Sequence, residues 1–123
     1  MVVRVVDASA LAALLFGEPE GAMVAERLGD ARLVAPALLA FELGNVCLTK
    51  CRRHPALRTA LIEAFALRGR LPVEEVSVDH DAVLDLAQAV GLTVYDASYL
   101  WVARQMGAEI VTLDRQLAAA AGG

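Results

Sequence analysis

The amino-acid sequence predicts an α/β fold in which helices flank a central, mainly parallel, twisted sheet in three layers. Short apolar runs alternate with segments of helical periodicity along the chain. Three of these runs (VVRVV, LTVY and EIVTL) are followed directly by an aspartate (Asp7, Asp96 and Asp114). If the runs before Asp7 and Asp114 are parallel strands, both aspartates lie at the carboxyl edge of the sheet, where open α/β folds bind ligands.

Length and composition limit what the chain can be. Its 123 residues, 58% of them hydrophobic, suit one domain over residues 1–123 with a large core. Charges interrupt every apolar tract before the roughly 20 residues that a membrane-spanning helix needs. The first apolar run contains Arg4 and is followed by Asp7, unlike a secretory signal. We therefore expect a cytoplasmic protein with no membrane partner.

The first quarter of the chain predicts one strand and two helices. Val2–Val6 is apolar except for Arg4, which is typical of a buried parallel strand. Ala8–Phe16 follows with helical periodicity. The break Gly17–Pro19 separates it from a second helix over Pro19–Leu28.

The central part predicts a strand and two helices. Arg32–Ala35 is the strand, and Pro36 suits the first turn of a helix that reaches about Arg53. Pro55 interrupts this helix because the residue before a proline avoids the helical region. Another helix is expected over Pro55–Leu67, closed by Gly69.

The last third predicts two strands and three helices. Pro72–Val78 and Glu109–Leu113 are the strands, and the helices cover residues 79–91, Tyr95–Met106 and Arg115–Ala121. Strands that alternate with helices in this way indicate a parallel sheet with right-handed crossovers.

Four acidic residues are candidates for a functional site. Each of Asp7, Asp96 and Asp114 opens a helix, so each taken alone is typical of an N-cap. Glu42 differs because it lies in the apolar helix PALLAFELGNVC, where burying a carboxylate costs several kcal/mol unless a partner meets it. Exposure to water, or pairing with an arginine, is the alternative for Glu42. Asn45 lies on the same helical face as Glu42 and is placed to hold that carboxylate or a water.

Carboxylates that converge repel one another unless a cation neutralises them. Mg²⁺ prefers oxygen ligands, and no histidine or cysteine lies within four residues of any of the four acids. Cys47 and Cys51 lie one helical turn apart but have no second Cys or His pair to complete a zinc site. The residue types therefore favour magnesium over a softer metal.

Four segments of the sequence together resemble a known family. The segments VVDASAL, PALLAFELGNV, YDASYLWVARQMGAEIVTLD and DRQLAAAA resemble, in order and spacing, the PIN-domain ribonucleases, most closely the VapC-type toxins of toxin–antitoxin pairs. The resemblance runs from Val3 to about Ala120. It implies a PIN-like fold and an endoribonuclease that hydrolyses RNA phosphodiester bonds with Mg²⁺, for which Mn²⁺ can substitute.

The resemblance also implies roles for individual residues. Asp7, Glu42, Asp96 and Asp114 match the family's catalytic, metal-binding acids, and Ser9, Asn45 and Thr112 match its supporting polar residues. It further implies a cognate antitoxin protein that lies across the active-site groove, and a homodimer formed through helical faces. The segment from Cys51 to Arg70 matches little of the family pattern, so its role stays open.

A basic segment offers candidate RNA contacts on a chain of net charge −4. The segment from Lys50 to Arg70 contains six basic residues and a single acid, Glu63. Those expected to follow an RNA backbone are Lys50, Arg52, Arg53 and Arg58. Two solvated helix faces would explain the same pattern. With only six aromatic residues, most of them expected in the core, base stacking is not anticipated.

Two other functions remain open. A non-catalytic protein- or RNA-binding module would keep the three aspartates as helix caps, but that scheme does not require Glu42. A receiver or phosphatase of the aspartyl-phosphate type also uses an aspartate at a strand end, together with a second nearby acid and a lysine. Asp7-Ala8-Ser9 supplies neither, and Lys50 is the chain's one lysine.

Overall fold

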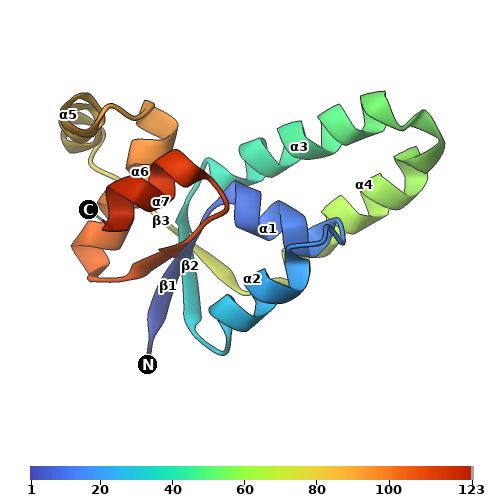
Figure 1. Cartoon of the computed structure of the whole chain (residues 1–123), viewed down its shortest axis with the longest axis horizontal. Helices are drawn as coiled ribbons and strands as arrows, with labels where there is room; N and C mark the ends of the chain where they lie inside the picture. The colour runs from blue at the N-terminus through green and yellow to red at the C-terminus, as the bar shows by residue number, and fades with distance from the viewer. Residues whose placement is uncertain (123) are drawn as a thin grey trace.

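A four-stranded parallel sheet forms the centre of the computed structural model, which describes residues 1–122 (Figure 1). The strand order is β3-β2-β1-β4, and all pairings among these strands are parallel. The strands are β1 (Val3–Val6), β2 (Arg32–Pro36), β3 (Val73–Val76) and β4 (Glu109–Val111). The prediction of a parallel sheet is confirmed.

Helical segments connect the strands. The α-helices are α1 (Ala8–Leu15), α2 (Gly21–Leu28), α3 (Leu39–Arg53), α4 (Arg58–Ala66), α5 (His80–Val90), α6 (Val94–Met106) and α7 (Arg115–Gly122). Two short 3-10 helices, η1 (Pro55–Leu57) and η2 (Leu67–Arg70), flank α4. Each expected helix has a counterpart with shifted ends, except that the one expected over Pro55–Leu67 is divided.

The middle strands are covered on both faces. Val5 and Val6 are neighbours in β1 and point to opposite faces of the sheet, yet both are fully buried. Helix α6 packs against β1, β2 and β4, whereas α1 contacts α2 and α3, and α2 also reaches β4. Figure 1 shows α5, α6 and α7 on one side of the sheet and α1 and α2 on the other, which confirms the three-layer arrangement.

Helices α3 and α4 form a hairpin that extends away from the sheet (Figure 1). Helix α3 buries Leu39, Leu43 and Cys47 against the rest of the protein, but α4 buries none of its residues. The sheet and the start of α3 are therefore fixed by the core, and the far end of the hairpin is not.

Several expected boundaries are wrong for local reasons. Pro36 is the last residue of β2, paired with Val76, because a proline without an N–H is tolerated where the ladder ends; the next helix begins only at Leu39. The helix expected over Pro55–Leu67 is split into η1 and α4. Gly69 does not close it: α4 ends at Ala66, the chain continues as the 3-10 helix η2, and Gly69 within η2 does not adopt the left-handed conformation of a helix-ending glycine.

No helix within residues 1–122 has both the length and the apolarity needed to cross a bilayer. Cys47 and Cys51 are free thiols, Cys47 being buried. The single-domain organisation over residues 1–123 stays a prediction, and Gly123 lies outside the described residues.

Candidate active site

The four predicted acids meet in one cavity of about 270 Å³ at the carboxyl edge of the sheet. Asp7 follows β1, Asp114 follows the adjacent strand β4, Glu42 lies in the first turn of α3, and Asp96 lies in the first turn of α6. The other residues that line this acid cavity are Ala8, Ser9, Asn45, Val46 and Tyr99. Segments far apart in the sequence thus bring their carboxylates together.

Asp7 is the most firmly held of the four, with only 5% of its surface exposed. One carboxylate oxygen accepts hydrogen bonds from the Ser9 hydroxyl (2.8 Å) and from the Ala10 amide (3.0 Å). Its other oxygen accepts a bond from the Thr112 hydroxyl. The predicted supporting residues Ser9 and Thr112 therefore both orient Asp7, which is an N-cap of α1 and a wall of the acid cavity at once.

Asp114 and Asp96 differ in how their helices are capped. The Asp114 carboxylate accepts from the Leu117 amide (2.9 Å), and its own amide donates to the Thr112 hydroxyl (3.0 Å). The alternative in which Asp96 caps its helix does not hold: Thr93 is the N-cap of α6, and its hydroxyl accepts from the Asp96 amide (3.1 Å). The Asp96 carboxylate is therefore not needed as a cap.

Glu42 is half-buried and accepts a hydrogen bond from the hydroxyl of Tyr99 (2.7 Å). Tyr99 is 1% exposed and was not among the residues predicted for the site. The detectable signal was spacing: Asp96 and Tyr99 are three residues apart and so share a helix face. Asn45 lies at the exposed rim of the acid cavity, one helical turn after Glu42.

The electrostatics of the acid cavity favour a cation. Burial first, and then repulsion from Asp96 and Asp7, raise the pKa of Glu42 above its ordinary value. Burial, followed by repulsion from Asp114 and Asp7, likewise raises the pKa of Asp96. Burial also raises the pKa of Asp7, with a smaller contribution from Asp114, although its hydrogen bonds to Thr112, Ala10 and Ser9 act in the opposite direction.

The donor set fits a hard divalent ion. The lining of the acid cavity contains four carboxylates and no lysine or arginine, and no described ion pair involves these four acids. Within residues 1–122, no group of three or more acidic, histidine or cysteine side chains is arranged to hold one metal ion together. Mg²⁺ typically uses only one or two direct carboxylates and keeps several waters, so this looser arrangement suits it.

The four predicted RNA-contact residues lie at different distances from the acids. Lys50 is half-buried, bound to Glu18 (2.7 Å) and placed over the Phe16 ring (5.7 Å). Lys50 and Arg53 line a basic cavity of about 330 Å³ that shares Asn45 and Val46 with the acid cavity. Arg52 and Arg58 are exposed, at the end of α3 and the start of α4.

The pairing of Lys50 also bears on the aspartyl-phosphate alternative. Such a site needs a lysine beside the strand-end aspartate, and the chain's one lysine is held by Glu18 outside the lining of the acid cavity. This arrangement disfavours that reaction class.

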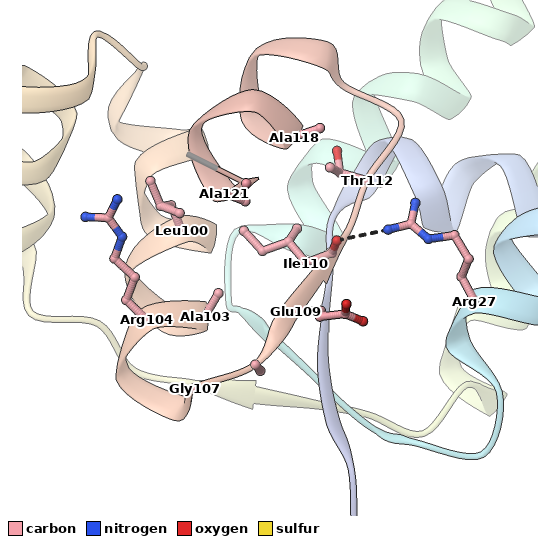
Figure 2. Close-up of a pocket in the computed structure, with 12 residues that line it drawn as sticks. Arg27, Leu100, Ala103, Arg104, Gly107, Glu109, Ile110, Thr112, Ala118 and Ala121 are labelled. Atoms are coloured by element: carbon pink, nitrogen blue, oxygen red, sulfur yellow. Dashed lines mark hydrogen bonds between the residues drawn. The ribbon is translucent and has the colours of Figure 1, made fainter.

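A larger cavity of about 540 Å³ lies beside the edge strand β4 (Figure 2). Figure 2 shows it between Arg27 and Arg104, with Arg27 bonded to the Ile110 carbonyl (3.3 Å). None of the four acids lines it, and Thr112 is the one predicted site residue that does. The smaller acid cavity is therefore the better candidate for an active site, because its lining brings the four carboxylates together.

Comparison with known proteins identifies this arrangement. Residues 4–123 match the PIN domain family. The chain belongs to that family. A similar protein is Ribonuclease VapC3 of Pyrobaculum aerophilum, 36% identical over 120 residues that cover 93% of this chain and 91% of that protein. The resemblance stated from the sequence motifs is confirmed.

Solved structures show the same PIN domain fold. The crystal structure of PAE2754 from Pyrobaculum aerophilum has a TM-score of 0.77 and 32% identity, covering 96% of this chain and 84% of that one. Mycobacterium tuberculosis VapC20, described as a sarcin–ricin loop cleaving toxin, has a TM-score of 0.67 and 21% identity, covering 95% and 94% of the two chains. These comparisons establish the fold. The roles of the individual acids stay predictions.

Proposed function

We propose that this PIN domain is a Mg²⁺-dependent endoribonuclease, active also with Mn²⁺, and the toxin of a type II toxin–antitoxin pair. The observation that carries the proposal is the meeting of Asp7, Glu42, Asp96 and Asp114 in one cavity whose lining contains no lysine or arginine. Similarity to Ribonuclease VapC3 supports RNA as the substrate. A binding module that used the aspartates only as caps would not need Glu42 there.

Each residue has a distinct part in the proposed mechanism. The four acids would hold Mg²⁺ or Mn²⁺, which when bound lowers the pKa of a water and offsets charge that develops on a phosphate. Ser9 and Thr112 fix the orientation of Asp7, and Tyr99 fixes that of Glu42. Rigid carboxylates keep the reacting phosphate and water in the geometry that in-line attack requires.

Asp96 is the best placed proton acceptor, because Thr93 rather than Asp96 caps α6. Its carboxylate takes a proton from water as the water oxygen forms a bond to phosphorus. The bond from phosphorus to the leaving ribose oxygen breaks, and that oxygen takes up a proton. One water is consumed for each phosphodiester cut. Single-stranded or looped RNA suits this open cavity better than a duplex, which hides its bases.

The test pairs cleavage with metal binding. The purified protein is expected to cut a mixed RNA pool with Mg²⁺ or Mn²⁺ and to be inactive in EDTA. Asp7→Asn and Glu42→Gln should each lower cleavage on the order of 10³-fold, because a lost carboxylate removes both charge and positioning. Calorimetric titration with Mn²⁺ alone should show weaker binding to both variants.

Asp79→Asn is the matched control, because Asp79 is an exposed N-cap of α5 outside the acid cavity. It should keep full cleavage and Mn²⁺ affinity. A folded Asp7→Asn protein that cleaves at the wild-type rate would reject the proposed centre. Mn²⁺ binding with no cleavage of any RNA would favour the non-catalytic binding module instead.

The partner proposals follow from the same family. We expect a cognate antitoxin protein to cover the active-site groove, and two copies to associate through helical faces. The exposed apolar residues of α3, η1 and α4 supply surface for such contacts: Leu48, Leu57 and Ile62. Light scattering of the purified chain should give the mass of a homodimer, and a monomer at all concentrations would reject that assembly. The cytoplasmic location remains a prediction.

A further inference from the structure

Two exposed aromatic side chains border the acid cavity. Phe41 in α3 is 81% exposed and Tyr95 in α6 is 64% exposed, among the most exposed large hydrophobic residues of the described chain. Together with Leu38, Glu42 and Asn45 they line a further cavity of about 400 Å³, called here the aromatic cavity. Its size lies within the range of pockets that hold small ligands.

The aromatic cavity adjoins the proposed reaction centre. Glu42 and Asn45 belong to the linings of both, so whatever fills the aromatic cavity contacts the same wall as the reacting phosphate. On the other side, the basic cavity with Lys50 and Arg53 also shares Asn45. Around Asn45 the surface therefore changes from aromatic through acidic to basic.

We propose that the aromatic cavity is a nucleobase subsite, in which Phe41 and Tyr95 hold one unpaired base next to the phosphate that is cut. This inference rests on the proposed ribonuclease function and adds to it the feature that selects the cleavage position. Four of the six aromatic residues lie in the core or pack against it, as expected, whereas Phe41 and Tyr95 do not. The proposal therefore differs from the expectation that base stacking has little part.

Three observations favour a base over an apolar side chain of a protein partner. Phe41 and Tyr95 present π-faces, and stacking on aromatic side chains is the usual way in which single-stranded nucleic acids hold their bases. Glu42 and Asn45 offer hydrogen-bond groups that an apolar side chain would leave unpaired. A base is neutral, so it tolerates nearby carboxylates, while the adjoining Arg53 suits a phosphate of the same strand; Lys50 in that cavity is paired with Glu18.

The test uses Phe41→Leu and Tyr95→Leu, with Phe41→Trp as the conservative variant. These side chains are largely exposed, so circular dichroism should show wild-type folding for all three. The probe is single-stranded RNA roughly 10 nucleotides long, carrying the fluorescent base 2-aminopurine, in Ca²⁺. The two leucine variants should bind roughly 5- to 150-fold more weakly and quench the fluorophore less, whereas Phe41→Trp should bind as tightly as the wild type.

An abasic probe separates stacking from other effects. If one base occupies the aromatic cavity, removing that base should weaken wild-type binding by the same factor, and Phe41→Leu should then add no further loss. Leu84→Ala is the control for lost exposed apolar surface, because Leu84 is 57% exposed on α5 and lines none of the three cavities. It should bind both probes as the wild type does.

The outcomes separate this subsite from the proposed function. If the wild-type protein cleaves RNA and both leucine variants bind and cleave at the same positions and rates, the subsite is wrong and the ribonuclease stands. If the wild-type protein neither binds nor cleaves RNA with Mn²⁺, the proposed function itself fails. If the leucine variants instead change the mass of the protein in solution, the aromatic residues form an interface between copies, and the base subsite is overturned.

Discussion

The acid-lined edge of the sheet and the outer hairpin, residues 51–70, hold their side chains in opposite ways. At the sheet edge, Asp7 has three hydrogen-bond donors and Glu42 is fixed by a buried tyrosine. In the outer hairpin no residue is buried, and apolar side chains such as Ile62 and Leu67 face solvent.

The difference separates chemistry from recognition. Groups that must meet within a few ångströms are attached to the core, and surface that must fit a partner is left on the outer hairpin. Helix α3 joins the two regions, because its first half carries Glu42 and Asn45 and its last turn carries Arg52 and Arg53. One helix therefore offers matched positions for testing both.

The largest difference should appear when equivalent apolar side chains are truncated. Leu43 is 1% exposed in α3 and Ile62 is 41% exposed in α4. Leu43→Ala should lower the free energy of unfolding by about 2–5 kcal/mol because it leaves a cavity in the core. Ile62→Ala should change it by about 0.5 kcal/mol or less. Urea unfolding measures both, and equal losses would show that the outer hairpin is as firmly packed as the core.

Site residues marked by local sequence features were predicted, whereas those that depend on contacts between distant segments were not. Asp7 and Asp114 were found because strand-to-helix boundaries are local features, and Glu42 because a carboxylate in an apolar helix is locally anomalous. Tyr99 was missed because its partner Glu42 lies 57 residues away, and only the packing of α6 beside α3 brings them together.

The N-cap of α6 could have been predicted from the sequence. Thr93 stands three residues before Asp96, which is the spacing of an N-terminal capping motif. The exposure of Phe41 and Tyr95 could not be predicted from the sequence, because a helical pattern does not show which face of a helix its neighbours leave uncovered. Sequence thus predicted the acids well and their surroundings less well.

A second test compares threonine hydroxyls in the two regions. Thr112 is buried, donates to Asp7 and accepts from the Asp114 amide, whereas Thr49 is exposed in α3. Thr112→Val should lower the free energy of unfolding by about 1–3 kcal/mol, because it removes partners from buried polar groups. Thr49→Val should stay within about 0.5 kcal/mol of the wild type. Thermal unfolding in EDTA measures both variants, and equal losses of unfolding free energy would contradict the expected difference between the two threonines.

A third test compares two tyrosine hydroxyls. Burial and the neighbouring Glu42 raise the pKa of Tyr99 far above its usual range, so its hydroxyl stays protonated and keeps donating. Tyr99→Phe should lower Mn²⁺ affinity about 10- to 100-fold, as loss of a group that orients a metal ligand does. Tyr95→Phe keeps the exposed ring and should leave Mn²⁺ affinity unchanged. Calorimetric titration decides, and equal affinities for all three proteins would remove Tyr99 from the site.

The smallest effect should be a pH dependence of stability that belongs to the acid cavity alone. Because the pKa of Asp7 is raised in the folded protein, its contribution is most favourable below its unfolded pKa of about 3.9 and is lost as pH rises through the higher folded pKa. In EDTA, the unfolding free energy of the wild type minus that of Asp7→Asn should therefore fall between acidic and neutral pH and then level off. The asparagine side chain of that variant keeps an oxygen for Ser9 and Ala10, but its amide nitrogen donates and so cannot accept the bond from the Thr112 hydroxyl. The loss of that bond does not depend on pH, so the pH dependence of the difference still reports the charge. A difference that rises with pH would mean that the folded protein stabilises the Asp7 carboxylate even without metal. Repulsion among the acids at this edge would then not be the reason that the site favours a cation.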